Sequence, residues 1–163
     1  MRNNDILRRL RFIFDCSDSK MMSLFKEGGK DVTRADVSSW LKKEDDPDVV
    51  LCTDLLLAIF LNGFISDRRG KREGVEPVAE NYLSNNHILR KLRIGLNLKD
   101  EDFIEILSLV ERPISRHELS AFFRKKGHKN YRACKDQVLR NFLAGLQVKY
   151  RGEKKIEPDF VWK

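Results

Sequence analysis

The chain has 163 residues, enough for one compact domain or two small ones with a real core. Charged residues make up 35% and aromatic residues 9%, a composition that excludes intrinsic disorder. Early arginines exclude a secretory signal, and the longest apolar stretch, residues 49–65, is too short to span a bilayer comfortably. The three cysteines have no CxxC spacing, so we expect unpaired thiols in a cytoplasmic protein.

The first predicted element is a helix that occurs twice. NNDILRRLR, beginning at Asn3, returns as NNHILRKLR, beginning at Asn85, and a shift of 82 residues then holds without a gap to Gly70 and Gly152. About 19 of the 68 aligned positions are identical. The apolar residues space as one helix face, and the asparagines are predicted N-caps. The chain is therefore read as a tandem repeat.

Two shorter helices follow in each copy. Apolar residues at 21–25 and 103–107 predict a second helix, and Gly28-Gly29 ends its first copy. A third helix opens with a capping box, formed by Thr33 with Asp36 and by Ser115 with Glu118.

The fourth helix is the longest, and Pro47 suggests its first position. We predict matching buried positions in the two copies: Leu57, Phe60, Leu61 and Leu139, Phe142, Leu143. In the first copy the helix is apolar nearly all round, because Leu55, Ala58 and Ile59 replace polar residues of the second. Such a helix is central or lies in an interface, so either the second repeat or a second copy of the protein covers it.

We therefore predict an all-α protein, with two tandem four-helix repeats related by a pseudo-twofold and packed into one helical unit. The expected boundaries are 1–70 for the first repeat, 71–84 for a connector, 85–152 for the second repeat and 153–163 for a C-terminal tail. GVEP in the connector is echoed by KIEP in the tail, and these segments could pair as a small ribbon.

The combination of motifs resembles a known family. NNDILRRLR, the FL-x-G block at Phe60 and Phe142, and the RG…EP endings resemble the YehS-like family, which consists of small bacterial proteins built from a tandem domain of unknown function. The resemblance covers nearly the whole chain. It implies an all-helical, cytoplasmic, bacterial protein and supplies no activity, cofactor or catalytic residue.

Asp54 and Asp136 stand at equivalent places in otherwise apolar helices. They could be paired carboxylates for acid/base or metal chemistry. The structural alternative, which we prefer, is an ion pair with an arginine of the first helix, because a buried charge needs a partner. The candidate arginines are Arg8 or Arg11 for Asp54, and Arg90 or Arg93 for Asp136.

Other chemistry finds little support in the sequence. The three histidines show no metal-ligand spacing, the cysteines have no neighbouring histidine partner, and no phosphate-binding glycine loop is present. We expect no metal and no cofactor, and an enzyme is only the third hypothesis.

The positive charge is concentrated in the second repeat. Residues 1–70 hold 12 basic and 12 acidic side chains, whereas residues 85–152 hold 15 and 7. The loop before the last helix reads RKKGHKNYR, and its equivalent in the first repeat is acidic. Such a cluster could grip phosphates and stack a base, although charged loops are often merely solvated. The candidate residues are Arg124, Lys125, Lys126, Lys129, Tyr131 and Arg132.

The pattern of the second and third helices and the turn between them also resembles a helix-turn-helix, whose second helix would present polar side chains to a DNA groove. Helical pairs of this kind also occur in bundles that bind no nucleic acid.

Two main hypotheses for the function follow from the sequence. The first is a non-catalytic regulatory or nucleic-acid-binding protein, and the alternative is an assembly module that forms a homodimer through the apolar fourth helix of the first repeat.

Overall fold

The computed structural model describes residues 1–70 and 78–152, and this part of the chain forms eight helices and no strand. The first repeat contains α1 (Asn3–Ile13), α2 (Asp18–Glu27), α3 (Arg34–Leu41) and α4 (Asp54–Arg69). The second contains α5 (Asn85–Leu96), α6 (Asp100–Ser108), α7 (Arg116–Phe123) and α8 (Asp136–Arg151). Each helix of the second repeat begins 82 residues after its equivalent, so the prediction of two tandem four-helix repeats is confirmed.

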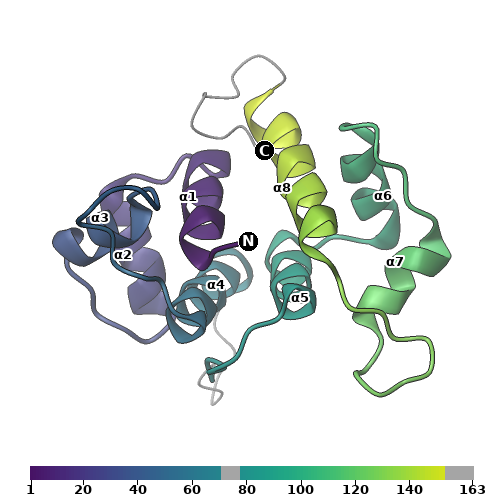
Figure 1. Cartoon of the computed structure of the whole chain (residues 1–163), viewed down its shortest axis with the longest axis horizontal. Coiled ribbons are helices and arrows are strands. Elements are labelled where there is room, and N and C mark those ends of the chain that lie inside the picture. The colour runs from purple at the N-terminus through teal and green to yellow at the C-terminus, as the bar shows by residue number, and fades with distance from the viewer. Residues whose placement is uncertain (71–77, 153–163) are drawn as a thin grey trace.

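The two repeats pack through their first and last helices. The last helix of the first repeat, α4, packs against α5, and α1 packs against α8 (Figure 1). These two contacts exchange when the repeats exchange, which is the relation expected of a pseudo-twofold. The shorter helices α2, α3, α6 and α7 lie at the two outer ends of the molecule (Figure 1).

Local signals placed some helix ends correctly and others wrongly. Both predicted capping boxes of the third helices are present, and Gly28 is the C-cap of α2. Asn3 and Asn85 are not N-caps but the first residues of their helices, because their side chains bind other segments. Pro47 does not begin α4, which starts at Asp54 after the side chain of Thr53 caps it.

The core consists of matched positions in the two halves. The six predicted residues of the fourth helices are all at most 1% exposed, as the repeat alignment requires. Gly63, from the FL-x-G block, lets α4 cross α2 at close range, since a Cβ there would lie 1.7 Å from the carbonyl oxygen of Leu24. Gly145 does the same against Ile106, where the distance would be 2.4 Å. The glycine of this motif is therefore a packing requirement in both repeats.

The apolar character of α4 is explained within the chain. This helix packs against α2 of its own repeat and against α5 of the other. Ala58 is 0% exposed and Ile59 is partly buried, while Leu55 remains 38% exposed. The prediction of a homodimer surface is therefore wrong for Ala58, because the monomer itself already buries this residue.

One asparagine in each repeat, Asn4 or Asn86, joins the first helix to other segments of that repeat through hydrogen bonds. Asn4 Nδ2 donates to the carbonyl oxygens of Trp40 (3.0 Å) and Val50 (2.8 Å), and its Oδ1 accepts from the backbone nitrogen of Cys52 (3.0 Å). Asn86 makes the same three bonds in the second repeat, to Phe122, Arg132 and Cys134. The loop before each last helix is thus fixed to the start of each first helix.

Asp54 and Asp136 complete this arrangement, but not as predicted. Asp54 accepts from Asn3 Nδ2 (2.7 Å) and Asp136 from Asn85 Nδ2 (2.8 Å), so an asparagine takes the place of the expected arginine. Three of the four candidate arginines have other carboxylate partners, which lie on the same helix or on the next one. Arg8 pairs with Asp5, and the equivalent pairs Arg11–Asp18 and Arg93–Asp100 join each first helix to the second. Arg90 donates instead to the carbonyl oxygen of Phe123 (3.4 Å).

No helix in the described part of the chain is long and apolar enough to cross a bilayer. The predicted pairing of GVEP with KIEP falls in 71–77 and 153–163, outside the described residues.

Candidate nucleic-acid interface

A pocket of about 490 Å³ lies where α5 begins and the loop between α7 and α8 returns. The two sides of this hollow, which we call the basic pocket, come from the segment 82–90 and from the loop residues 124–134. In Figure 1 they are the teal segment that leads into α5 together with the start of that helix, and the green loop between α7 and α8. The basic pocket is therefore formed entirely by the second repeat and the residues that lead into it.

The scaffold of the basic pocket follows from local capping. Ser84 caps α5: its Oγ accepts from the backbone nitrogen of His87 (3.2 Å), and its own backbone nitrogen donates to His87 Nδ1 (3.1 Å). Because Nδ1 accepts, the neutral imidazole carries its proton on Nε2, which remains a donor. Asn86 anchors the opposite wall through Arg132 and Cys134. Both walls are thus held by hydrogen bonds that do not involve the basic side chains.

Four cations line this hollow. Arg90 comes from α5, and Arg124, Lys125 and Lys126 come from the end of α7 and the loop after it. All four are exposed. Within residues 1–70 and 78–152, no carboxylate lies within ion-pair distance of any of them. Among the described residues, nothing acidic therefore offsets the positive charge of the basic pocket, to which the N-terminal end of α5 adds its dipole.

The equivalent place in the first repeat is neutralised. Arg8, the equivalent of Arg90, pairs with Asp5 at 2.7 Å, and Asp5 is replaced by His87 in the second repeat. Glu44 stands where Lys126 stands and pairs with Arg2 at 3.2 Å. At these two positions the first repeat thus has ion-paired carboxylates where the second repeat has His87 and Lys126.

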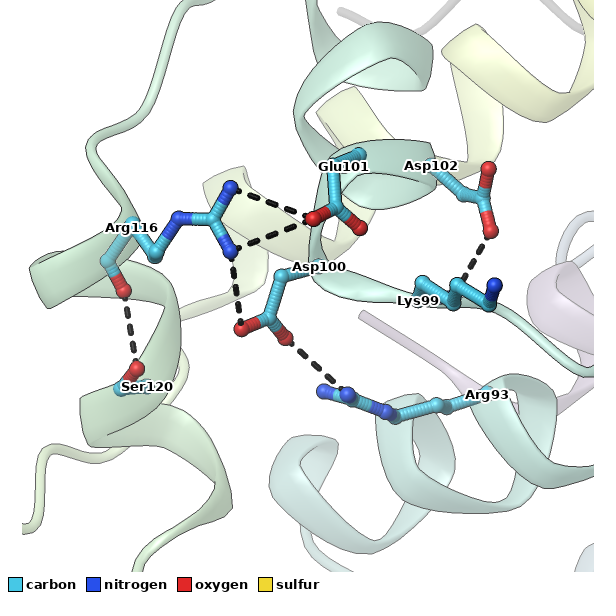
Figure 2. Close-up of polar contacts among 7 residues, drawn as sticks. All are labelled: Arg93, Lys99, Asp100, Glu101, Asp102, Arg116 and Ser120. Atoms are coloured by element: carbon cyan, nitrogen blue, oxygen red, sulfur yellow. Dashed lines mark hydrogen bonds and ion pairs between the residues drawn. The ribbon is translucent and has the colours of Figure 1, made fainter.

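A second hollow of about 530 Å³ adjoins the basic pocket and shares Arg90 and Arg124 with it. Its other lining includes Arg93, Asp100 and Phe123. Figure 2 shows how the acidic groups here are occupied: Asp100 lies 3.0 Å from Arg93 and 3.9 Å from Arg116, which also reaches Glu101 at 3.3 Å. Arg93 and Arg116 are thus balanced by Asp100 and Glu101, and the positive charge of the second hollow comes from Arg90 and Arg124, which it shares with the basic pocket.

The structure brings together four of the six predicted nucleic-acid-binding residues, namely Arg124, Lys125, Lys126 and Tyr131. Lys129 and Arg132 are exposed on the same loop but do not line the basic pocket. Tyr82, His87 and Arg90 also line it and were not among the nucleic-acid-binding residues predicted from the sequence. The available signal was the one charge change inside the repeated NNDILRRLR motif, where Asp5 becomes His87.

The helix-turn-helix hypothesis does not fit the geometry. Residues 28–33 join α2 to α3, and residues 109–115 join α6 to α7, so both connections exceed the three- or four-residue turn of that motif. The side chain of Arg116, on the helix that would have to enter the groove, is engaged by Glu101 and Asp100. Lys42 and Arg124 are the C-caps of α3 and α7. The basic pocket, and not the face of a recognition helix, is the candidate binding surface.

Neither a metal site nor a reactive cysteine is evident among the described residues. In the described part of the chain, no three His, Cys, Asp or Glu side chains are grouped as metal ligands. Burial, with a smaller effect of the neighbouring Asp54 and Asp136 charges, raises the pKa of the Cys52 and Cys134 thiols to about 12. Both thiols are therefore un-ionised near neutral pH and poor nucleophiles.

Fold and site together define a tandem four-helix repeat protein with a basic pocket in its second repeat. The chain belongs to the family described as "Protein of unknown function (DUF1456)", whose model matches twice, over residues 3–70 and 85–152. It is 38% identical over 157 residues to "Uncharacterized protein YehS" of Escherichia coli (strain K12), a match that covers 94% of this chain and 99% of that protein. These matches confirm the YehS-like resemblance. No solved structure matches the chain significantly.

Proposed function

We propose that the protein binds nucleic acid through the basic pocket of its second repeat and acts as a non-catalytic, regulatory binding protein in the cytoplasm. The observation that carries this proposal is a hollow that contains aromatic side chains and four exposed cations, none of which pairs with a carboxylate of residues 1–70 or 78–152. Phosphates are neutralised by such cations, and bases stack on such rings. The unpaired cysteines are consistent with a reducing compartment.

The comparison between the two repeats supports the proposal. A solvated basic loop would need no hollow, yet here the loop cations converge with Arg90 from another helix. In the first repeat the corresponding arginine is paired with Asp5. The difference in charge therefore lies at one defined place on a common scaffold, as expected of a binding site that only one repeat retains.

The test is binding of labelled single- and double-stranded oligonucleotides, followed by fluorescence anisotropy at low salt. We expect binding that weakens as salt rises, and loss of binding in the double variant Lys125→Glu, Lys126→Glu. The control is Lys26→Glu, Lys30→Glu, which makes the same change in net charge on exposed residues of the first repeat. Equal losses in the two double variants, or no binding by the wild type, would contradict the proposal.

The alternative function is homodimeric assembly through the first repeat. One observation favours it: Val50, Leu51 and Leu55, at and just before the start of α4, are exposed by 50%, 59% and 38%. Their equivalents in the second repeat are Arg132, Ala133 and Gln137. This alternative predicts a dimer in solution whose mass the Lys125→Glu, Lys126→Glu variant leaves unchanged, together with no affinity for nucleic acid. Light scattering on the same variant separates the two functions.

A further inference from the structure

Two hollows of the second repeat meet at one pair of arginines. Arg90 and Arg124 line both the basic pocket and the adjoining hollow that contains Phe123. The pair therefore stands at the boundary between two hollows of about 490 and 530 Å³, each within the size range of small-ligand sites. This arrangement suits a chain of linked units better than one compact ligand.

Aromatic rings are distributed along the same path. Tyr131, which is partly buried, lines the basic pocket together with Tyr82 and His87, and the last two rings meet edge to face at 6.5 Å. In the second hollow the guanidinium of Arg93 lies over the ring of Phe123, 4.6 Å from its centroid. Rings and cations thus line both hollows, a composition typical of sites that bind single strands by stacking bases and neutralising phosphates.

The concave shape of the site favours a single strand over a duplex as its ligand. Readers of duplex DNA insert a protruding helix or ribbon into a groove, and the bases of a duplex are already stacked on one another. Here the cations and rings line hollows, and Arg116 and Ser120 on the exposed side of α7 are held by internal contacts. A base can enter the basic pocket only if it is unstacked from its neighbours.

We infer that the ligand of this site is single-stranded nucleic acid, with one base stacked on Tyr131 in the basic pocket and the adjoining phosphate at Arg90 and Arg124. The second hollow receives the next unit of the strand beside Arg90 and Arg124, whereas Arg93 and Arg116 are offset there by Asp100 and Glu101. This inference rests on the proposed function and specifies its ligand.

The experiment compares a short oligothymidylate, an oligouridylate and a blunt duplex of the same length by fluorescence anisotropy at one low salt concentration. The variants are Tyr131→Ala, Tyr131→Phe and Arg90→Gln, with Arg8→Gln as the control at the equivalent position of the first repeat. Circular dichroism and melting temperature verify that each variant folds. Inorganic polyphosphate serves as a polyanion that has no bases.

We expect the single strands to bind more tightly than the duplex. Tyr131→Ala should weaken single-strand binding by about 5- to 150-fold, the range for losing one stacked base, while Tyr131→Phe keeps it. Tyr131→Ala should not change polyphosphate binding, whereas Arg90→Gln should weaken binding of every polyanion and Arg8→Gln of none.

Three outcomes overturn the inference. Duplex binding that equals or exceeds single-strand binding would leave the proposed function intact but exclude a single-stranded ligand. Unchanged single-strand binding in folded Tyr131→Ala would exclude the stacked base. If no nucleic acid binds to the wild type while polyphosphate does, the proposed function itself fails.

Discussion

The carboxylate of Asp54 accepts a hydrogen bond from the backbone nitrogen of Leu83, at 2.9 Å. Asp54 begins the last helix of the first repeat, and Leu83 lies just before the first helix of the second. Its equivalent, Asp136, meets the backbone nitrogen of Met1, which is the position equivalent to Leu83. Each aspartate therefore accepts hydrogen bonds both from an asparagine of its own repeat and from the segment just before the first helix of the other repeat. The two repeats are thus joined by two equivalent contacts.

Replacing Asp54 with Ala should destabilise the protein by about 1–3 kcal/mol, because the amide of Asn3 and the backbone nitrogen of Leu83 both lose their acceptor. Urea denaturation measures the change. The control is Asp67→Ala on the same helix, which removes only an exposed ion pair with Lys20 and should cost less than about 1 kcal/mol. Equal costs for the two variants would mean that the inter-repeat hydrogen bond contributes nothing.

The matched phenylalanines of the two cores provide a second prediction. Phe60→Ala and Phe142→Ala should each lower the free energy of unfolding by about 3–5 kcal/mol, since each ring is 1% exposed and its removal leaves a cavity. Leu55→Ala, at an exposed position of α4, should cost much less. A large effect in only one of the two phenylalanine variants would show that the repeats do not contribute equivalent cores.

The two glycines of the FL-x-G blocks should differ in their tolerance of Ala. At Gly63 all the nearest atoms are backbone atoms of α2 and its C-cap, with the Leu24 oxygen at 1.7 Å, so the helices must separate. At Gly145 the nearest oxygen lies at 2.4 Å and one close atom belongs to the side chain of Ile106, which can move. Gly63→Ala should therefore cost more than the usual 1–3 kcal/mol of overpacking, and Gly145→Ala less than Gly63→Ala. Thermal or urea unfolding would contradict this if the order were reversed.

Much of the fold could be predicted because its determinants are local. Helical periodicity, the capping boxes at Thr33 and Ser115, and the buried Phe60 and Phe142 all depend on residues a few positions apart. The partner of Asp54 could not be predicted in this way. An aspartate in an apolar helix indicates that a partner exists, but the choice of Asn3 and Leu83 depends on how the two repeats pack.

The candidate site was only partly predictable for the same reason. The charge of the loop at Lys125 and Lys126 is visible in the sequence, whereas its meeting with Arg90 results from the bonds of Asn86 to Phe122, Arg132 and Cys134. The sequence motif suggests that such asparagines cap helices. Their actual role, binding backbone groups 36 to 48 residues away, appears only once the chain is folded.

The thiols should react in a defined order. The pKa of Cys52 and of Cys134 is raised to about 12, mainly by burial, so roughly one such thiol in ten thousand is ionised at pH 8. Burial also raises the pKa of Cys16, but this side chain is partly exposed. A thiol reagent at pH 8 should therefore modify Cys16 first, and Cys52 and Cys134 only after unfolding in denaturant. Mass spectrometry of partly modified protein identifies the site, and early modification of Cys52 would contradict the burial of its repeat's core.

The salt dependence of nucleic-acid binding should identify which cations contact phosphates. If Arg90, Arg124, Lys125 and Lys126 each neutralise one phosphate of a single strand, log K should fall with log salt with a slope of about −3. Lys126→Gln should make this slope shallower by about 0.7, because one fewer counterion is released. Lys129→Gln makes the same charge change on the same loop, but Lys129 does not line the basic pocket and its loss should leave the slope unchanged. Equal changes in slope for the two variants would mean that the whole loop, and not the hollow, attracts the phosphates.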